Sequence, residues 1–529
     1  MKKHSILKVL LFTIVAVAIC SWIFPSAQFT DTLVEGERIQ AGLFDLFAYP
    51  GIVLQYFGSI LLFVLTCGIF YGVAYRISAY HQLVERIVDG FKGMEYLFLS
   101  AIIILISVIV SVTGISIPII FVFPFVIDVV IKMGYNRLIA ATVTVGSTVA
   151  GIAGTTLGAM TTSYMNQVLG LTAFDEMISK VIILVIFIIL LIAQVVLYSK
   201  KTKNSTIEVK DTPKEEVKVE QEEVVVKASK KTSKKTEKTK TTKQSTKKST
   251  NSTKSTGKRG RPAKNSAAMA KENSETLVVK TKSQKKANIW PFAIIFDLVL
   301  ICMAISVFDW NGLFEISWFE EATEAVTTYE IFGFEIFGKL LGQIQAFGGW
   351  SLGAEMVTLI MIATCVLALV YRVKWDDFID GICDGFRKAL EPAVIILLTY
   401  VVLVVVTYHP FQLIIAKFLL DLTSGINVVT MTLVSLFSSF FNVDLTYVTQ
   451  STLPYVQSVI TDSSLYPLIG VIFQAIYGLA LLVAPTSFIL MGTLSYLNVS
   501  YKQWLKYIWK LFLTLLAILV VIFLIILAL

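Results

Sequence analysis

Val483-Ala484-Pro485-Thr486-Ser487 interrupts a long apolar stretch near the end of the chain, and Gly151-Ile152-Ala153-Gly154-Thr155-Thr156 interrupts a similar stretch in the first half. Proline removes a backbone donor and glycine permits non-helical angles, so each motif predicts a helix that unwinds partway along. Unwound backbone is tolerated at membrane depth only where protein or a water-filled cavity satisfies its polar groups. The two motifs therefore predict interrupted membrane helices with polar groups gathered at each break.

The composition around these motifs is that of a membrane protein. The chain has 529 residues, of which 56% are hydrophobic and only 16% charged, and this excludes an ordinary soluble globule. Apolar runs of about the length that crosses a bilayer occur at 9–24, 52–74, 138–158, 181–197, 290–308, 356–370, 393–408, 468–483 and 504–529. We expect an all-α polytopic membrane protein with about nine spanning helices.

Two further apolar segments, 96–131 and 426–460, are each divided by a short polar break. The breaks are Thr113-Gly114-Ile115-Ser116 and Asn442-Val443-Asp444-Leu445-Thr446. We interpret both segments as re-entrant hairpins. Irregular backbone at their tips would again need polar partners inside the membrane, so the tips indicate a binding site.

The two halves of the chain repeat each other at an offset of 328 to 332 residues. Pro124 matches Pro454, Tyr135 matches Tyr466, and the run 163–166 matches 495–498. A rival register near 296 pairs residues 89–92 with 384–387 and extends less far. We take the longer register as the repeat.

Charge predicts the topology. Residues 200–287 contain 26 basic and 10 acidic side chains with almost no aromatics, which predicts a disordered cytoplasmic linker, whereas 309–350 contains seven acids and one base and is expected outside. The expected parts are a first helix with an outer loop (1–50), repeat 1 with an inner hairpin (51–198), the basic linker (199–288), linking helices with the acidic loop (289–389), and repeat 2 with an outer hairpin (390–529). The N-terminus is then cytoplasmic, the C-terminus extracellular, and the repeats are inverted, as in secondary transporters.

Two breaks facing two hairpin tips predict one site for a substrate and an ion. The candidate residues are Thr113, Gly114 and Ser116 of the first tip, Asn442, Asp444 and Thr446 of the second, Gly154, Thr155 and Thr156 of the first break, and Pro485, Thr486 and Ser487 of the second. Freed carbonyls and hydroxyls suit a sodium ion, and a helix N-terminus suits a carboxylate. The alternative is that these small residues only let helices pack closely.

Sodium is the favoured coupling ion, because the candidate residues offer many oxygens and few titratable groups. Asp444 is the residue that could carry a proton instead. The five cysteines and three histidines are scattered and predict no metal cluster, and no cofactor is expected. No phosphate-binding loop or nucleophile motif occurs, so we do not expect an enzyme.

One motif in the linker suggests a different function. Lys258 is followed by Arg259, Gly260, Arg261 and Pro262, a run that resembles the AT-hook core, whose arginines enter the DNA minor groove. A membrane-anchored nucleic-acid tether acting through the Lys-rich linker is therefore the alternative reading, although a solvated tail near anionic lipid is the favoured one.

The second half resembles a known group of permeases. Phe473-Gln474, Ala484-Pro485-Thr486-Ser487 and Trp504-Leu505-Lys506 resemble the F-Q…T-P-T-S…K-W-L-K run of YfcC-like and C4-dicarboxylate-uptake-like permeases in the ion transporter superfamily, and Trp22-Ile23-Phe24-Pro25 is similar to their W-I-I-P. The resemblance covers both repeats and excludes the linker. It implies an elevator-type carrier with a fixed scaffold, which moves carboxylates or amino acids with sodium or protons.

The chain also departs from that family pattern. The polar G-D-G-F-x-N stretch before P-T-S is Ile476-Tyr477-Gly478-Leu479-Ala480-Leu481 here, and the S-G-S-G of the second hairpin is absent. We predict a plasma-membrane secondary transporter for a dicarboxylate, another small carboxylate or an amino acid. The expected partners are the substrate and the bilayer. Whether the chain also forms a homodimer is left open.

Overall fold

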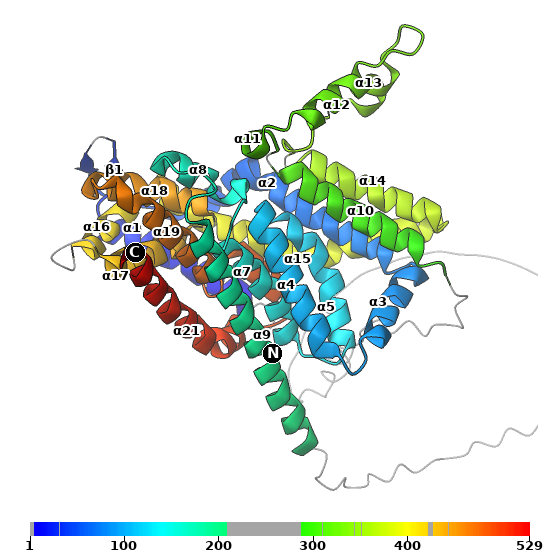
Figure 1. Cartoon of the computed structure of the whole chain (residues 1–529), viewed down its shortest axis with the longest axis horizontal. Helices are drawn as coiled ribbons and strands as arrows, with labels where there is room; N and C mark the ends of the chain where they lie inside the picture. The colour runs from blue at the N-terminus through cyan, green and yellow to red at the C-terminus, as the bar shows by residue number, and fades with distance from the viewer. Residues whose placement is uncertain are drawn as a thin grey trace, which may run out of the picture. The chain divides into compact units, whose positions relative to one another are not determined.

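The structure, a computed structural model, describes residues 5–30, 32–208, 287–308, 310–342, 344–350, 352–421, 427–442 and 444–528. The described parts of 1–205 and 286–529 form one compact helical unit (Figure 1). Most of the predicted linker, including Arg259 to Pro262, lies outside the described residues, as do Asp309 and Val443.

The first half contains thirteen described helices, helical turns and strands. They are α1 (Ser5–Ile23), β1 (Ala27–Phe29), β2 (Leu33–Glu35), α2 (Leu43–Ala74), α3 (Ser78–Gly90), α4 (Glu95–Thr113), η1 (Pro118–Val122), α5 (Phe123–Lys132), α6 (Arg137–Ala141), η2 (Thr142–Gly146), α7 (Ser147–Ala153), α8 (Ala159–Leu169) and α9 (Met177–Glu208). The two strands pair antiparallel, with Gln28 opposite Val34. η2 is a turn of π-helix and η1 is a 3₁₀ helix.

The second half is entirely helical where the structure describes it, apart from loops and one isolated bridge. Its elements are α10 (Trp290–Val307), α11 (Trp310–Phe314), α12 (Trp318–Thr327), α13 (Ile336–Leu341), α14 (Glu355–Val370), α15 (Trp375–Tyr408), α16 (Gln412–Leu420), α17 (Val428–Phe441), α18 (Leu445–Val459), η4 (Ser463–Leu465), α19 (Tyr466–Ala480), α20 (Phe488–Tyr496) and α21 (Tyr501–Ala528).

Eight described helices are long and apolar enough to cross a membrane, which confirms the prediction of an all-α polytopic membrane protein. Seven of them coincide with predicted spans, and the eighth is α4, the predicted first arm of a hairpin. The other two predicted spans are shorter apolar helices, at 137–153 and in α14. The first of these is short because its helix ends at the predicted break.

The order of elements is the same in both halves and fits the longer repeat register. A long helix (α2 or α15) is followed by a short one (α3 or α16), two arms (α4 and α5, or α17 and α18), an interrupted helix (ending in α8 or α20) and a last long helix (α9 or α21). The first pair of arms folds back on itself, because the rings of Tyr96 and Tyr135 at its two ends lie 6.3 Å apart. In the second pair, α17 packs on α18.

The long helices α2 and α15 pack against each other along their lengths. Gly68 lies against Gly385 and Ala389, and Gly72 lies against Gly381 and Gly385, so the two helices run antiparallel. A Cβ atom added at Gly72 would collide with the carbonyl oxygen of Gly381 and lie 2.6 Å from the Cα atom of Gly385. Small residues on both helices thus allow a backbone approach of the kind that drives helix pairing in lipid. Antiparallel packing of these equivalent helices is what inverted repeats require.

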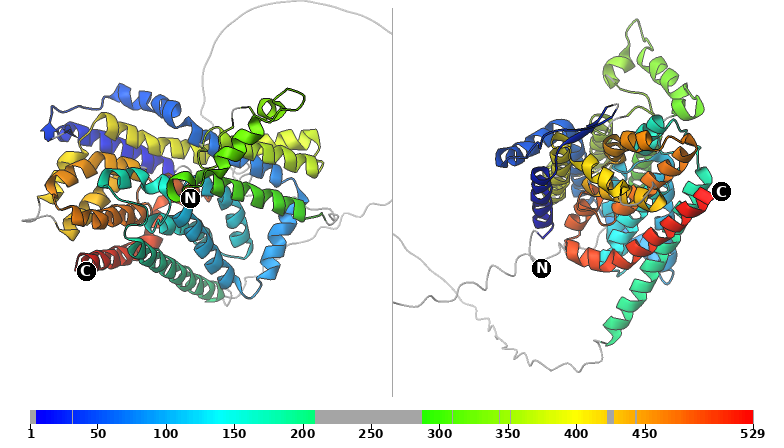
Figure 2. Two further views of the ribbon diagram at one scale, coloured as in Figure 1. Left: turned by 45° about the horizontal axis from the view of Figure 1, so that its top comes forward. Right: turned by 90° about the vertical axis from the view of Figure 1, so that its left-hand side faces the viewer.

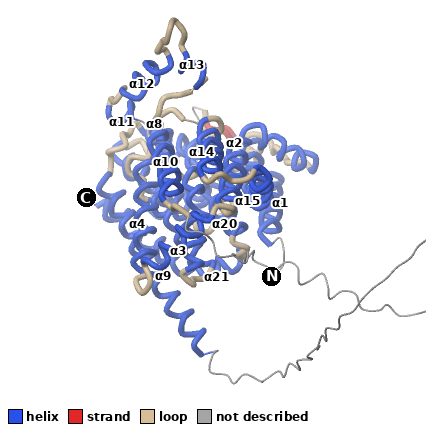
Figure 3. The backbone as a smooth tube through the Cα atoms, turned by 90° about the vertical axis from the view of Figure 1, so that its right-hand side faces the viewer, coloured by secondary structure: helices blue, strands red, loops and turns tan. Residues whose placement is uncertain are grey.

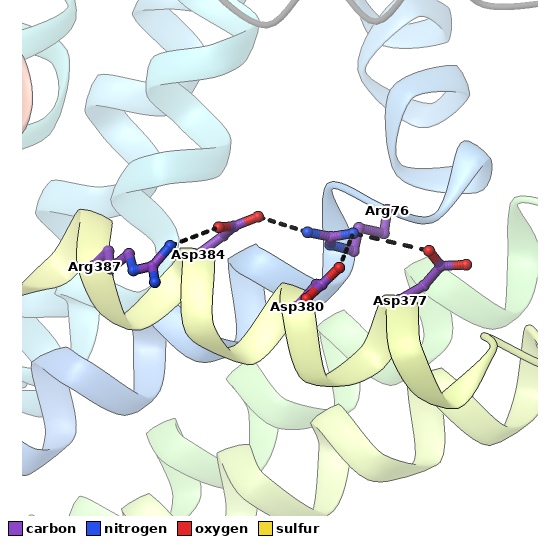
Figure 4. A network of polar contacts seen from close by, with 5 residues as sticks. All are labelled: Arg76, Asp377, Asp380, Asp384 and Arg387. Carbon is purple, nitrogen blue, oxygen red and sulfur yellow. Dashed lines mark hydrogen bonds and ion pairs between the residues drawn. The ribbon is translucent and has the colours of Figure 1, made fainter. Parts of the chain in front are cut away.

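An ionic network joins one end of this helix pair (Figure 4). Arg76, just after α2, lies 2.5 Å from Asp384 and 3.9 and 4.0 Å from Asp377 and Asp380, all on α15. Arg387 lies 3.9 Å from the other oxygen of Asp384. The three aspartates stand on one face of α15 because they are spaced three and four residues apart.

The other end of the pair is held by hydrogen bonds to His409. His409 Nδ1 lies 2.7 Å from the carbonyl oxygen of Ile39, which only accepts, so Nδ1 carries the proton. Its Nε2 lies 2.6 Å from the Tyr49 hydroxyl. Nearby, outside the long helices, Glu35 lies 2.9 Å from Lys417 and raises the pKa of that lysine by hydrogen bonding and charge attraction.

The remaining elements surround this core. α9 and α21 cross each other (Figure 2), and the rings of Tyr198 and Tyr507 lie 4.5 Å apart at the crossing. The segment from α11 to α13 projects from one end of the helical bundle, and the end of α9 projects from the opposite end (Figure 3).

Candidate functional site

The first break is residues 154–158, between α7 and α8. Gly154 fits against Leu184 of α9, since a Cβ atom there would lie 2.6 Å from the Leu184 Cβ atom. The Thr155 hydroxyl bonds back to the carbonyl oxygens of Gly151 and Ile152 at 3.1 and 2.8 Å. The predicted unwinding of this helix is thus present, and glycine at its start allows α9 to approach.

The first hairpin tip lies directly on the first break. The Thr156 N–H donates to the carbonyl oxygen of Ser111 at 2.9 Å, and the Ser111 hydroxyl donates to the carbonyl oxygen of Gly154 at 2.6 Å. Gly114 has a φ of +72° and meets the backbone of Gly158, where a Cβ atom would lie 2.7 Å from the Gly114 Cα atom. Two glycines are therefore needed at this crossing, one for its angle and both for the close approach.

The other two candidates of the first tip have local roles in the described structure. The Thr113 hydroxyl donates to the carbonyl oxygen of Ile109 within α4 and accepts weakly from the Ile115 N–H. Ser116 is half-buried beyond the glycine. Both residues therefore lie near the break because they flank Gly114, and not because they bond to the break directly.

The second break is residues 481–487, between α19 and α20. Two of its freed carbonyls are taken by aromatic side chains of α21: the Trp504 Nε1–H donates to Leu482 at 2.7 Å, and the Tyr501 hydroxyl donates to Val483. Ser487 caps α20 by accepting from the Leu490 N–H. Each of these carbonyl oxygens keeps a second lone pair.

The second hairpin touches the second break as the first hairpin touches the first. The Thr486 hydroxyl donates to the carbonyl oxygen of Phe440, the penultimate residue of α17, at 2.9 Å. The Thr156 hydroxyl likewise donates to the carbonyl oxygen of Ser111 at 3.2 Å, and the two contacts are separated by 329 to 330 residues of sequence. The repeat thus reproduces one specific contact as well as the order of the helices.

A side chain absent from our candidate set joins the two repeats. Gln474 of α19 is buried, and its Nε2 donates to the carbonyl oxygens of Thr155 and Ala153 at 2.8 and 3.4 Å. One turn later Gly478 packs against the Ala153 backbone, where a Cβ atom would lie 2.5 Å away. Gln474 stood in the Phe473-Gln474 motif, so the sequence contained a signal, but nothing in the motif indicated that it would bind the break of the other repeat.

Asp444 lies at the second hairpin tip as the N-cap of α18, where its carboxylate accepts from the Thr446 N–H at 2.7 Å. The carboxylate interacts electrostatically with Tyr400, Tyr447 and Tyr477, which come from α15, α18 and α19. Tyrosine side chains from three helices therefore lie around this carboxylate.

Asn442 binds the short helix α16 rather than the breaks. Its amide donates to Gln412 Oε1 at 3.3 Å and to the carbonyl oxygen of Ser438 at 2.9 Å. The structure therefore places the twelve candidates in two clusters, one on each hairpin and break, and Gln474 of α19 binds the first break from repeat 2. Pro485 is half-buried within the second break.

Several buried polar atoms near these clusters have no hydrogen-bond partner among the described residues. They are Gln474 Oε1, Ser435 Oγ, Ser438 Oγ and Gln412 Nε2. Buried polar atoms are almost always paired in native proteins, so these atoms are candidates for contact with a bound ion, substrate or water. In the described part of the chain, no group of three His, Cys, Asp or Glu side chains could hold a transition metal.

Paired helix breaks and hairpins inside a polytopic helical bundle define a membrane transporter, a class distinct from enzymes. A sequence model of the C4-dicarboxylate anaerobic carrier (DcuC) family matches residues 4–239 and 258–529. The chain belongs to this family, and it is a multi-pass plasma-membrane transporter of organic anions. The predicted resemblance to dicarboxylate carriers is thus confirmed. The resemblance to YfcC-like permeases stays a prediction. No curated protein and no solved structure gives a significant match to the chain.

Proposed function

We propose that this chain is a secondary active transporter that moves a C4-dicarboxylate, or a closely related small carboxylate, together with sodium ions. The observation that carries the proposal is the repeated contact between break and hairpin, at Thr156 with Ser111 and at Thr486 with Phe440. Each break is followed by a helix N-terminus, at α8 and α20. Helix N-termini attract carboxylates, and a dicarboxylate has one carboxylate for each.

Oxygen atoms around the breaks support sodium as the coupling ion. Gln474 Oε1 is buried and unpaired among the described residues, and the same side chain binds the Thr155 carbonyl, whose second lone pair remains available. Amide, carbonyl and hydroxyl oxygens are the ligands that hard cations prefer. Asp444 caps α18 through Oδ1, and it is the one acid among the twelve candidates, so its carboxylate also offers oxygen to a sodium ion.

Movement of the hairpins and broken helices against the α2–α15 pair is the proposed transport step. The glycine packing of α2 on α15 suits a fixed scaffold, since both backbones lie in contact. We place the N-terminus and linker in the cytoplasm and the C-terminus outside, following the charge pattern. Alternating access by inverted repeats is the mechanism that this arrangement supports, and a homodimer stays a prediction.

The test is uptake into proteoliposomes with the sodium gradient and the pH gradient imposed separately. Succinate, aspartate and a monocarboxylate are compared as substrates for the wild type, Asp444→Asn and Asp462→Asn. Asp462 is the matched control, because it caps η4 through the Ser464 N–H but is exposed and outside both clusters.

We expect succinate uptake driven by sodium, with a weaker sodium response in Asp444→Asn and an unchanged one in Asp462→Asn. Uptake driven by the pH gradient alone and abolished in Asp444→Asn would refute the sodium reading. Preference for the monocarboxylate over succinate would refute the dicarboxylate reading, whereas preference for aspartate, itself a C4-dicarboxylate, would show that the site also recognises an amino group.

A further inference from the structure

A cavity of about 70 Å³ that opens to the surface lies between α2, the η1–α5 arm, α15 and α20. Its wall is mostly apolar, with Val64, Phe123, Ile127, Pro392, Ile396 and Ile489 among the lining residues. None of the twelve candidate site residues lines it. The cavity is therefore a separate feature from the clusters at the breaks, although Phe488 of its wall directly follows the second break.

The helices that correspond to α5 and α20 in the other half of the molecule are in direct contact. The repeat-related helices are α8 and α18, which pack directly on each other. Gln457 of α18 donates to the Val168 carbonyl oxygen of α8 at 2.8 Å and closes that contact. Among the described residues, the α5–α20 side therefore differs from the α8–α18 side in leaving a cavity between its helices.

The tyrosine hydroxyls of the wall are already engaged. Tyr71 donates to the carbonyl oxygen of Phe121 at 2.7 Å, and Tyr75 donates to Asp128 at 2.9 Å and lies 3.3 Å from the Tyr496 hydroxyl. Asp128 accepts a second hydroxyl, from Tyr80, at 2.5 Å. Little polar capacity remains on these groups for a small, strongly hydrated ligand.

Lys388 is the single charged side chain among the lining residues. It is exposed, and its ammonium lies 4.4 Å from the centroid of the Tyr75 ring. Asp128 also attracts it, but that carboxylate is bound by two tyrosine hydroxyls. The neighbouring Arg387 is paired with Asp384 instead. The cavity thus combines an apolar interior with one cation at its edge.

We infer that this cavity binds a single-chain amphiphilic anion, a long-chain carboxylate, with its hydrocarbon chain among the apolar side chains and its carboxylate at Lys388. Burial of each methylene favours binding, whereas a small dianion would lose hydration without gaining partners. Four elements enclose one continuous space, which suits one chain better than the two chains of a phospholipid. The site lies where α5 and α20 meet α2 and α15, so its ligand would wedge between these helices.

The test is photo-crosslinking of the purified full chain with a diazirine analogue of palmitate, followed by mass spectrometry of the labelled peptides. We expect label on the peptides that contain Phe123–Ile127 and Phe488–Tyr496. Palmitate should compete for this label, and hexadecanol and succinate should compete poorly. Lys388→Met should weaken competition by palmitate about tenfold, because a charged contact is lost.

Two further variants keep the test decisive. Lys506→Met removes an exposed lysine of α21 that does not line the cavity, and it should leave labelling unchanged. Thr493→Phe should fill the cavity and remove the label while Lys388 is retained. Three outcomes would each overturn the inference: label spread over lipid-facing helices and insensitive to Lys388→Met, equal competition by hexadecanol, or displacement by phosphatidylglycerol but not by palmitate.

Discussion

Single side chains hold the broken backbone of this protein together. Gln474 binds the first break from the opposite repeat, and Trp504 and Tyr501 bind the second break from α21. Every peptide group that leaves a helix inside a membrane must find another partner, and these side chains supply it. Hydroxyls do the same between neighbouring segments, as Ser111 and Thr486 show.

Gln474→Leu should destabilise the protein. The substitution keeps the side-chain volume similar but leaves the carbonyl oxygens of Thr155 and Ala153 without their buried donor, which costs about 1–3 kcal/mol. Thermal unfolding in detergent measures the loss. Gln167→Leu, on the exposed face of α8, is the control and should unfold near the wild-type temperature. Equal stability of the two variants would contradict the bridging role.

Thr486→Val should raise the substrate or sodium concentration needed for half-maximal uptake, while the protein still expresses and folds. The hydroxyl that joins the second break to the second hairpin is lost, while the shape of the side chain is kept. Thr156→Val tests the related contact in the first repeat. Thr364→Val is the control, since Thr364 bonds only to its own helix α14. Unchanged uptake over a full concentration series would show that Thr486 serves helix packing and not the binding of substrate or ion.

At the scale of elements, glycines decide how closely helices approach. The α2–α15 pair depends on Gly68, Gly72, Gly381 and Gly385, and the first hairpin depends on the meeting of Gly114 with a glycine in the break. Backbones in contact leave no room for any side chain, so these positions tolerate substitution least. Other glycines of the same helices face open space.

Gly72→Ala and Gly58→Ala form a matched pair on one helix. A methyl group at Gly72 meets the α15 backbone, and overpacking of this kind costs about 1–3 kcal/mol. A methyl group at Gly58 meets nothing within 4 Å and should be neutral or slightly stabilising, because alanine favours a helix more than glycine does. Detergent unfolding temperatures check the difference. Similar temperatures for both variants would show that α2 and α15 separate more easily than this packing implies.

For the whole molecule, topology follows from where the charges lie. The acidic α11–α13 segment and the end of α9 project from opposite ends of the bundle (Figure 3). Lysines concentrate in the linker that follows α9, and the segment 309–350 is acidic. The positive-inside rule then places the linker in the cytoplasm and α11–α13 outside.

Cysteine labelling in cells tests this orientation. In a background without the five native cysteines, Glu320→Cys in the exposed α12 should react with a membrane-impermeant maleimide added outside. Ser249→Cys in the linker should react only after the cells are permeabilised. External labelling of the Ser249 position would invert the topology.

The sequence alone determined the membrane class, most of the spanning helices, the repeat and its two breaks, because apolar length, proline and glycine act locally along the chain. It also indicated the family, through short motifs around the second break. Only the tertiary structure decided which groups meet. Gln474 crosses from one repeat to the other, Trp504 and Tyr501 occupy carbonyls that the sequence predicted to be free, and a cavity opens beside Lys388. These contacts join residues that are distant in sequence, and no local periodicity encodes such pairings.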